Sequence, residues 1–169
     1  LAQYWIARKN ADKALIYAKE GVNIDPGNPQ ALYMLGQVQA AKGDLPNAAV
    51  TYKKLIELAP RLVQAHIRLA AVLQQSKDTK GARLALQQAL KVDPANVGAK
   101  SLLVGLALQD KDYATALDLS HRIQRDHPKA AAGFTLEGDV LMSQRQYQAA
   151  ARSYETAYGL ESSGALSVN

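Results

Sequence analysis

The sequence predicts an all-α fold, a right-handed superhelical solenoid of helix–turn–helix repeats with about ten helices and the start of another. Two sets of recurring residues support this prediction. Prolines and alanines each return at an interval of 34 residues, the prolines at Pro26, Pro60, Pro94 and Pro128 and the alanines at Ala14, Ala48, Ala82, Ala116 and Ala150. A fixed period of this length, with a small residue in one place and a helix-stopping residue in another, indicates stacked helical hairpins.

This period predicts that the 169 residues form a single repeat array. Residues 1–28 make a partial repeat, and four full repeats follow at residues 29–62, 63–96, 97–130 and 131–164. Residues 165–169 are expected to begin a further repeat. We therefore expect the chain to be a fragment of a longer protein.

Each repeat is expected to hold two helices that are separated by a short polar turn, near residues 42–44, 76–78, 109–112 and 145–146. Asp44, Asp78 and Asp112 are predicted to begin the second helix, because a short carboxylate accepts hydrogen bonds from the first backbone N–H groups. The recurring prolines are predicted to end that helix, since a proline disfavours the helical conformation of the residue before it. Asn28 and Pro29 indicate the start of the next one.

The recurring alanines predict where the two helices of a repeat approach each other most closely. Backbones come near only where side chains are small, so a larger residue at Ala48 or Ala82 would push the helices apart. Overpacking of this kind costs about 1–3 kcal/mol.

The second repeat resembles the tetratricopeptide repeat at most of its diagnostic positions, which here are Leu35, Gly36, Ala48, Tyr52 and Pro60. The resemblance extends over nearly the whole chain and implies the same helical-hairpin solenoid. The sequence departs from the family pattern at His66 and Lys100, where a bulky apolar residue is usual, at Glu137, where leucine is usual, and at Ser162, which replaces the closing proline.

A finer resemblance covers residues 130–166, which are similar to the last repeats of the PrsT-like tetratricopeptide lipoproteins of bacterial PEP-CTERM systems. Those proteins accompany exopolysaccharide and exosortase gene sets. The resemblance implies a parent protein in the bacterial periplasm that is held by a lipid anchor.

Charge and motif content argue against several functional classes. The net charge of +5 comes from basic residues spread over the second helices among acidic ones, which is typical of a solvated surface and not of a nucleic-acid interface. No apolar run is long enough to span a membrane. There is no cysteine and no catalytic or phosphate-binding motif, and His66, His121 and His127 are interpreted as structural or solvated. We expect no enzymatic activity, cofactor or metal site.

In the tetratricopeptide family the first helices of the repeats line a concave groove, so the resemblance implies a set of ligand-binding residues here. These are Gln30, Tyr33, Met34, Gln37, Gln64, Ile67, Arg68, Gln74, Gln75, Ser101, Gln109 and Asp139. The set is rich in amides, which both donate and accept hydrogen bonds. Chaperone-adaptor members grip a C-terminal carboxylate with several Lys, Asn and Arg residues, of which only Arg68 has a counterpart. Glutamine is also simply a good helix former on a wet surface.

These features predict a non-catalytic interaction scaffold that holds an extended peptide or protein segment in its groove, within a bacterial envelope assembly. One alternative is a groove that contacts polysaccharide. Another is a spacer or oligomerisation element with no groove ligand. Apolar residues near both ends predict end-to-end self-association, namely Leu1, Trp5, Tyr158, Leu160, Leu166 and Val168.

Overall fold

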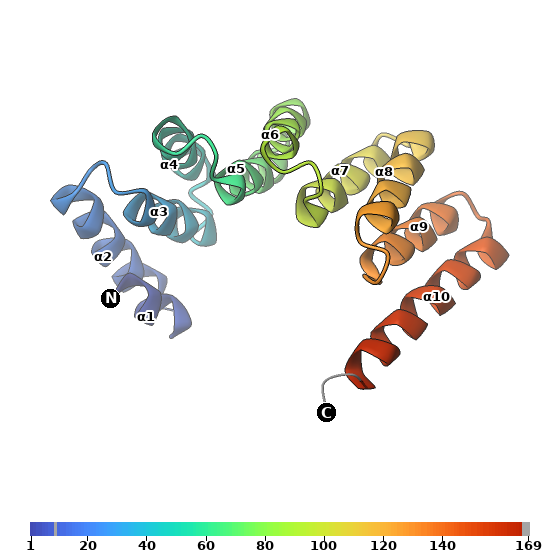
Figure 1. Ribbon diagram of the computed structural model, residues 1–169. Coiled ribbons are helices and arrows are strands. Elements are labelled where there is room, and N and C mark those ends of the chain that lie inside the picture. Colours follow the sequence, from blue (N-terminus) through green and yellow to red (C-terminus); the bar gives the residue numbers. More distant parts are fainter. Residues whose placement is uncertain (9, 167–169) are drawn as a thin grey trace. The chain divides into compact units, whose positions relative to one another are not determined.

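The computed structural model describes residues 1–8 and 10–166, and in these residues every regular element is an α-helix. The expected all-α fold of helical hairpins is confirmed (Figure 1). The chain divides into two compact units, Leu1–Asp93 and Pro94–Asn169. Within each unit every helix packs against the next one along the chain.

Ten helices lie in the described residues. The first unit contains α1 (Ala2–Ala7), α2 (Ala11–Ile24), α3 (Pro29–Ala41), α4 (Leu45–Leu58), α5 (Val63–Gln75) and α6 (Thr79–Val92). The second unit contains α7 (Val97–Gln109), α8 (Tyr113–Asp126), α9 (Ala132–Ser143) and α10 (Tyr147–Leu166).

The helix boundaries follow local sequence signals. Asp44, Asp78 and Asp112 each accept a hydrogen bond from the backbone N–H three residues later, at the starts of α4, α6 and α8. The side chain of Asn28 does the same for Gln30 and Ala31 at the start of α3. The helices α2, α4, α6 and α8 each end two residues before a recurring proline. These predicted starts and stops are confirmed.

The recurring alanines lie where the helices pack most tightly. All five have no exposed surface: Ala14, Ala48, Ala82, Ala116 and Ala150. A side chain that is fully enclosed leaves no room for a larger one, which is consistent with the smallest residue that has a Cβ at each of these places.

In the four full repeats, a second set of recurring positions pairs a residue of the first helix with a residue of the second helix. A Cβ on Gly36 would lie 2.8 Å from the ring of Tyr52, and a Cβ on Gly138 would collide with Tyr154 in the same way. The equivalent places hold Ala70 with Leu86 in the third repeat and Val104 with Ser120 in the fourth. The residue on the first helix grows from glycine to alanine to valine as its counterpart on the second helix shrinks from tyrosine to leucine to serine. Ala70, Leu86, Val104 and Ser120 are all buried.

Three polar residues that depart from the family pattern are accommodated by specific contacts. The Nε2–H of buried His66 donates to the carbonyl of Pro60 at 2.9 Å. Buried Lys100 donates to the carboxylate of Asp126. Glu137 accepts hydrogen bonds from His121, Gln124 and Ser153. A polar side chain is tolerated in such places because its hydrogen-bonding groups have partners.

The further repeat expected from residue 165 onward lies largely outside the described residues, but its first two residues belong to α10. α10 continues without a break to Leu166, so Ala165 and Leu166 extend this helix, and the last three residues lie outside the described part of the chain. The reason is local: Ser162 keeps the backbone N–H that a proline lacks, and nothing at this position stops the helix.

Candidate functional site

The structure places the expected ligand-binding residues of the first unit on α3 and α5, two helices that pack against each other. Gln30, Gln64, Arg68 and Gln75 are exposed, whereas Tyr33, Gln37, Ile67 and Gln74 are half-buried. None of these eight side chains lies buried between the helices. Met34 differs, because only 8% of it is exposed and it belongs to the core cluster that α1, α2 and α3 share.

Three hollows follow one another over α1 to α5. The first, of about 510 Å³, lies over α1, α2 and α3 and is partly lined by Gln30 and Met34. The second, of about 440 Å³, lies over α3 and α5 and includes Gln30, Tyr33 and Gln64. The third, of about 250 Å³, is lined by residues of α3, α4 and α5 that include Gln37 and Arg68. Asn28 and Gln30 line both the first and the second hollow, so these two adjoin.

A hydrogen bond connects the second hollow to the third. The Nε–H of Arg68 donates to the hydroxyl of Tyr33 at 3.1 Å. The ring of Tyr33 in turn meets the ring of Tyr52 edge to face, with centroids 6.2 Å apart and planes at 67°. The arginine is therefore held by a tyrosine that is itself packed against a buried ring.

The electrostatics of this cluster agree with its geometry. Burial raises the pKa of Tyr52 to about 12, with Arg68 acting in the opposite direction. The hydrogen bond to Tyr33 raises the pKa of Arg68 above its already high ordinary value, against the effect of burial. Tyr52 is therefore a neutral group at neutral pH, and Arg68 carries the charge.

In the second unit the expected residues lie on two helices. Half-buried Ser101 and exposed Gln109 belong to α7, and exposed Asp139 belongs to α9. The hydroxyl of Tyr154 donates to Asp139 Oδ1 at 2.7 Å. Burial, followed by this hydrogen bond, raises the pKa of Tyr154 to about 12.

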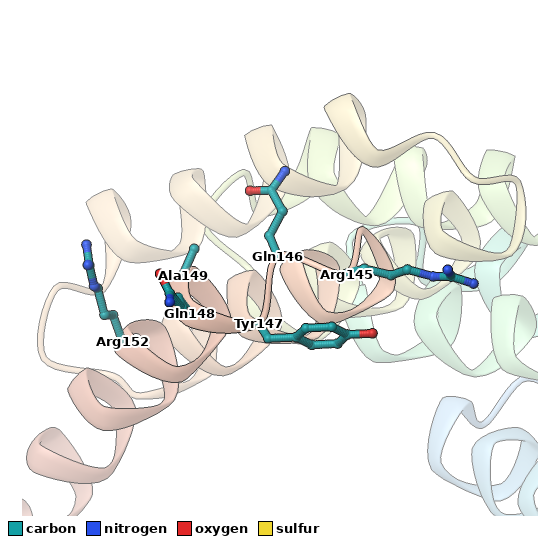
Figure 2. Close-up of a pocket in the computed structure, with 6 residues that line it drawn as sticks. All are labelled: Arg145, Gln146, Tyr147, Gln148, Ala149 and Arg152. Carbon is teal, nitrogen blue, oxygen red and sulfur yellow. The ribbon is translucent and has the colours of Figure 1, made fainter.

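A fourth hollow, of about 440 Å³, lies at the turn between α9 and α10 and at the start of α10. Figure 2 shows that its side chains do not converge: Arg145 and Tyr147 extend to one side and Arg152 to the other. A binding site needs polar groups that point toward a common ligand position. This arrangement does not provide one.

Sequence reasoning missed several residues of the hollows, above all Tyr52, Asn28 and Leu62, which line them together with the expected residues. Tyr52 lies on the second helix of its hairpin, outside the set of first helices that the family geometry selects. The pairing of a glycine on one helix with a tyrosine on the other was the signal that its ring reaches α3.

Each of the three histidines has a hydrogen-bond partner within the chain. His66 and His127 each donate to a backbone carbonyl, that of Pro60 and that of Ala95, at 2.9 and 2.8 Å. His121 Nε2 lies 2.9 Å from Glu137 Oε1. Among the residues that the structure describes, no three His, Asp or Glu side chains gather as a metal site would require.

The residues expected to support end-to-end association are placed differently from one another. Leu1 and Tyr158 are strongly exposed, at 83% and 73%. Trp5 packs partly against the core cluster of the first hairpins, and Lys13 Nζ lies 4.2 Å from the centre of its ring. The side chain of Leu166 lies outside the described part of the chain. No helix in the described residues combines the length and the apolar character needed to cross a membrane.

Comparisons with known proteins place the chain in a family. Two tetratricopeptide repeat models match it, one over residues 1–62 and the other over residues 73–139. It is 24% identical over 120 residues to the formate-dependent nitrite reductase complex subunit NrfG of Escherichia coli O157:H7. That alignment covers 69% of this chain but only 61% of NrfG, which is less than two thirds of that relative.

Two solved structures have the same fold. The crystal structure of MamA matches with a TM-score of 0.81 at 18% sequence identity, over 98% of this chain and 96% of that one. YrrB, described as a tetratricopeptide repeat protein with an unusual peptide-binding site, matches with a TM-score of 0.69 at 18% identity, over 94% and 82%. The chain therefore belongs to the tetratricopeptide repeat family, whose fold suggests a scaffold for protein–protein interaction.

Proposed function

We propose that the chain is a non-catalytic scaffold that binds an extended peptide, or an extended segment of a partner protein, along the three hollows of the first unit. The observation that carries this proposal is the run of hollows over α1 to α5, with Arg68 fixed by Tyr33 between the second and the third. A linear ligand matches hollows that follow one another better than a compact ligand would.

The chemistry of the lining supports a peptide backbone as the ligand. Gln30, Gln64, Gln37 and Gln75 border the hollows, and each amide both donates and accepts hydrogen bonds. An extended peptide presents both kinds of group along its length. Tyr33 adds an amphipathic ring of the kind that is enriched at interfaces. The unusual peptide-binding site of YrrB, which has the same fold, is consistent with this use of the array.

A pull-down from the cells that make the protein tests the proposal. The wild-type chain is compared with Tyr33→Ala/Gln37→Ala/Arg68→Ala and with a control of the same composition, Tyr147→Ala/Gln87→Ala/Arg122→Ala, whose sites lie in exposed positions on other helices. We expect a specific protein to be lost with the first variant and retained with the control. Retention of every partner by the first variant would contradict groove binding and favour a spacer.

Polysaccharide is a second candidate ligand, because an aromatic ring beside amide groups also suits sugar faces and hydroxyls. The same pull-down separates the two candidates, since a glycan and not a protein would then be lost with the groove variant.

We further propose that the assembly belongs to the bacterial envelope, with the parent protein lipid-anchored in the periplasm and associated with exopolysaccharide. The support is the resemblance of residues 130–166 to PEP-CTERM-system lipoproteins. Fractionation of the source cells with an antibody against this chain tests the location, and recovery in the cytoplasmic fraction would contradict it.

A further inference from the structure

We infer that the third hollow of the first unit is a subsite for an acidic side chain of the bound peptide, with Arg68 recognising the carboxylate and Tyr33 positioning Arg68. The inference rests on the proposed peptide-binding function and names the partner's chemistry. It adds one charged contact to the neutral hydrogen bonds that the amides of the groove can make.

The charge of the site indicates which ligand group it suits. Among the residues that line the second and third hollows, Arg68 is the one with a charged side chain, and the others are amides, tyrosines and apolar residues. Arg68 is exposed to solvent, so a ligand can reach it. The ligand group that complements this single charge is an anion, and the common anionic group of a peptide is a carboxylate.

The guanidinium of Arg68 is held in one orientation by a hydrogen bond. Its Nε–H donates to the hydroxyl of Tyr33, and the two terminal amino groups take no part in this bond. Arginine recognises a carboxylate by two parallel N–H to oxygen bonds, and that geometry requires a fixed guanidinium plane. Tyr33 supplies this restraint, because its own ring is packed against buried Tyr52.

The size of the third hollow suits a single side chain. At about 250 Å³ it has room for one side chain, and its lining includes the small apolar residues Ala40, Ala71 and Val72. Such a lining suits the methylene groups of Asp or Glu next to the charged end. Gln37 and Gln75 line the same hollow and can hydrogen-bond the backbone on either side of that residue.

The test uses the full chain and a phage-displayed library of random peptides. We expect the wild-type chain to select peptides with Asp or Glu at one shared position. In a synthetic peptide of the selected sequence, replacing that acid by its amide should weaken binding about tenfold, the usual worth of a hydrogen bond to a charged group. The same replacement should cost nothing further in Arg68→Gln, and it should still cost about tenfold in the control Arg122→Gln.

The outcomes separate the two proposals. If peptides are selected but show no acidic position, or if the acid-to-amide cost is the same in Arg68→Gln, the acidic subsite is wrong and peptide binding stands. If the wild-type chain selects no peptide at all, peptide binding is wrong and the subsite falls with it. Thermal unfolding of each variant verifies that the exposed substitution leaves the fold intact.

The positioning role of Tyr33 has its own readout. Tyr33→Phe keeps the ring and removes the hydroxyl that holds Arg68. We expect the cost of the acid-to-amide replacement to fall to about threefold, because a guanidinium that is no longer held must be ordered when the peptide binds, while the affinity for the amide peptide stays the same. An unchanged tenfold cost would show that Tyr33 does not position Arg68.

Discussion

Glu137 stands where the other repeats carry Leu35, Leu69 and Leu103, and its surroundings explain why a carboxylate is tolerated there. Burial alone would raise the pKa of Glu137. Hydrogen bonds from His121, Gln124 and Ser153 outweigh that effect, so its pKa lies below the ordinary 4.5. A residue that looks like a defect in the repeat pattern thus joins α8, α9 and α10.

This network predicts acid sensitivity in the second unit. A carboxyl whose pKa is lower in the folded state stabilises the fold above its unfolded-state pKa, and that stability is lost as the pH falls through the folded-state value. We expect Glu137→Gln to lower the free energy of unfolding at neutral pH by about 0.5–1 kcal/mol, since the site is partly open to solvent. The difference from wild type should shrink below pH 4.5.

Urea unfolding followed by circular dichroism from neutral pH downward measures this difference. Glu155→Gln, at an exposed position of α10, is the control. This substitution should change the free energy of unfolding by the same amount whether or not Glu137 is present. A pH-independent difference between Glu137→Gln and wild type would show that the carboxylate contributes packing alone.

Between elements, the two paired residues of each full repeat are complementary in size. Gly36→Ala alone should reduce the free energy of unfolding by about 1–3 kcal/mol, because the added methyl group meets the ring of Tyr52 on α4. In a chain that also carries Tyr52→Leu, which recreates the pairing of the third repeat, the methyl group has room. The two substitutions should therefore couple favourably by about 1 kcal/mol or more.

A double-mutant cycle with urea unfolding measures this coupling. Gly36→Ala combined with Leu86→Ala, a substitution in the next hairpin, is the control pair for which additivity is expected. Equal additivity in both pairs would mean that the backbone, and not the ring, limits the size of residue 36.

The helices themselves were largely predictable from the sequence, because their ends depend on local signals. Asp44 and Pro60 act on the backbone beside them, and the interval of 34 residues repeats these signals. The length of α10 was not predictable in this way, since Ser162 neither stops nor extends a helix by itself. The candidate site was predicted as a set of positions only. The hydrogen bond between Tyr33 and Arg68 joins two repeats. It depends on the directions of these two side chains, which the period of the sequence does not determine.

At the scale of the whole molecule, the division into two compact units predicts where damage spreads. Ala48→Leu overpacks α3 against α4 and should cost about 1–3 kcal/mol. Because repeat proteins are stabilised by contacts between neighbours, amide protection should fall mainly in α3 to α6 and remain in α8 to α10.

Hydrogen exchange followed by mass spectrometry locates this loss. Ala116→Leu is the matched substitution in the second unit, and its effect should concentrate in α7 to α10. A uniform loss of protection over both units with either variant would mean that the chain unfolds as one cooperative block.

The paired sizes of residues 36 and 52, 70 and 86, 104 and 120, and 138 and 154 also determine which pieces of this protein can be exchanged. A first helix with valine at this place cannot face a second helix with tyrosine, whereas a whole hairpin carries both members of its pair. Duplication, deletion or laboratory recombination can therefore shift complete hairpins along the chain and preserve these fits, but crossovers within a hairpin produce clashes or voids. The unit of this array that can be exchanged intact is therefore the hairpin of two helices.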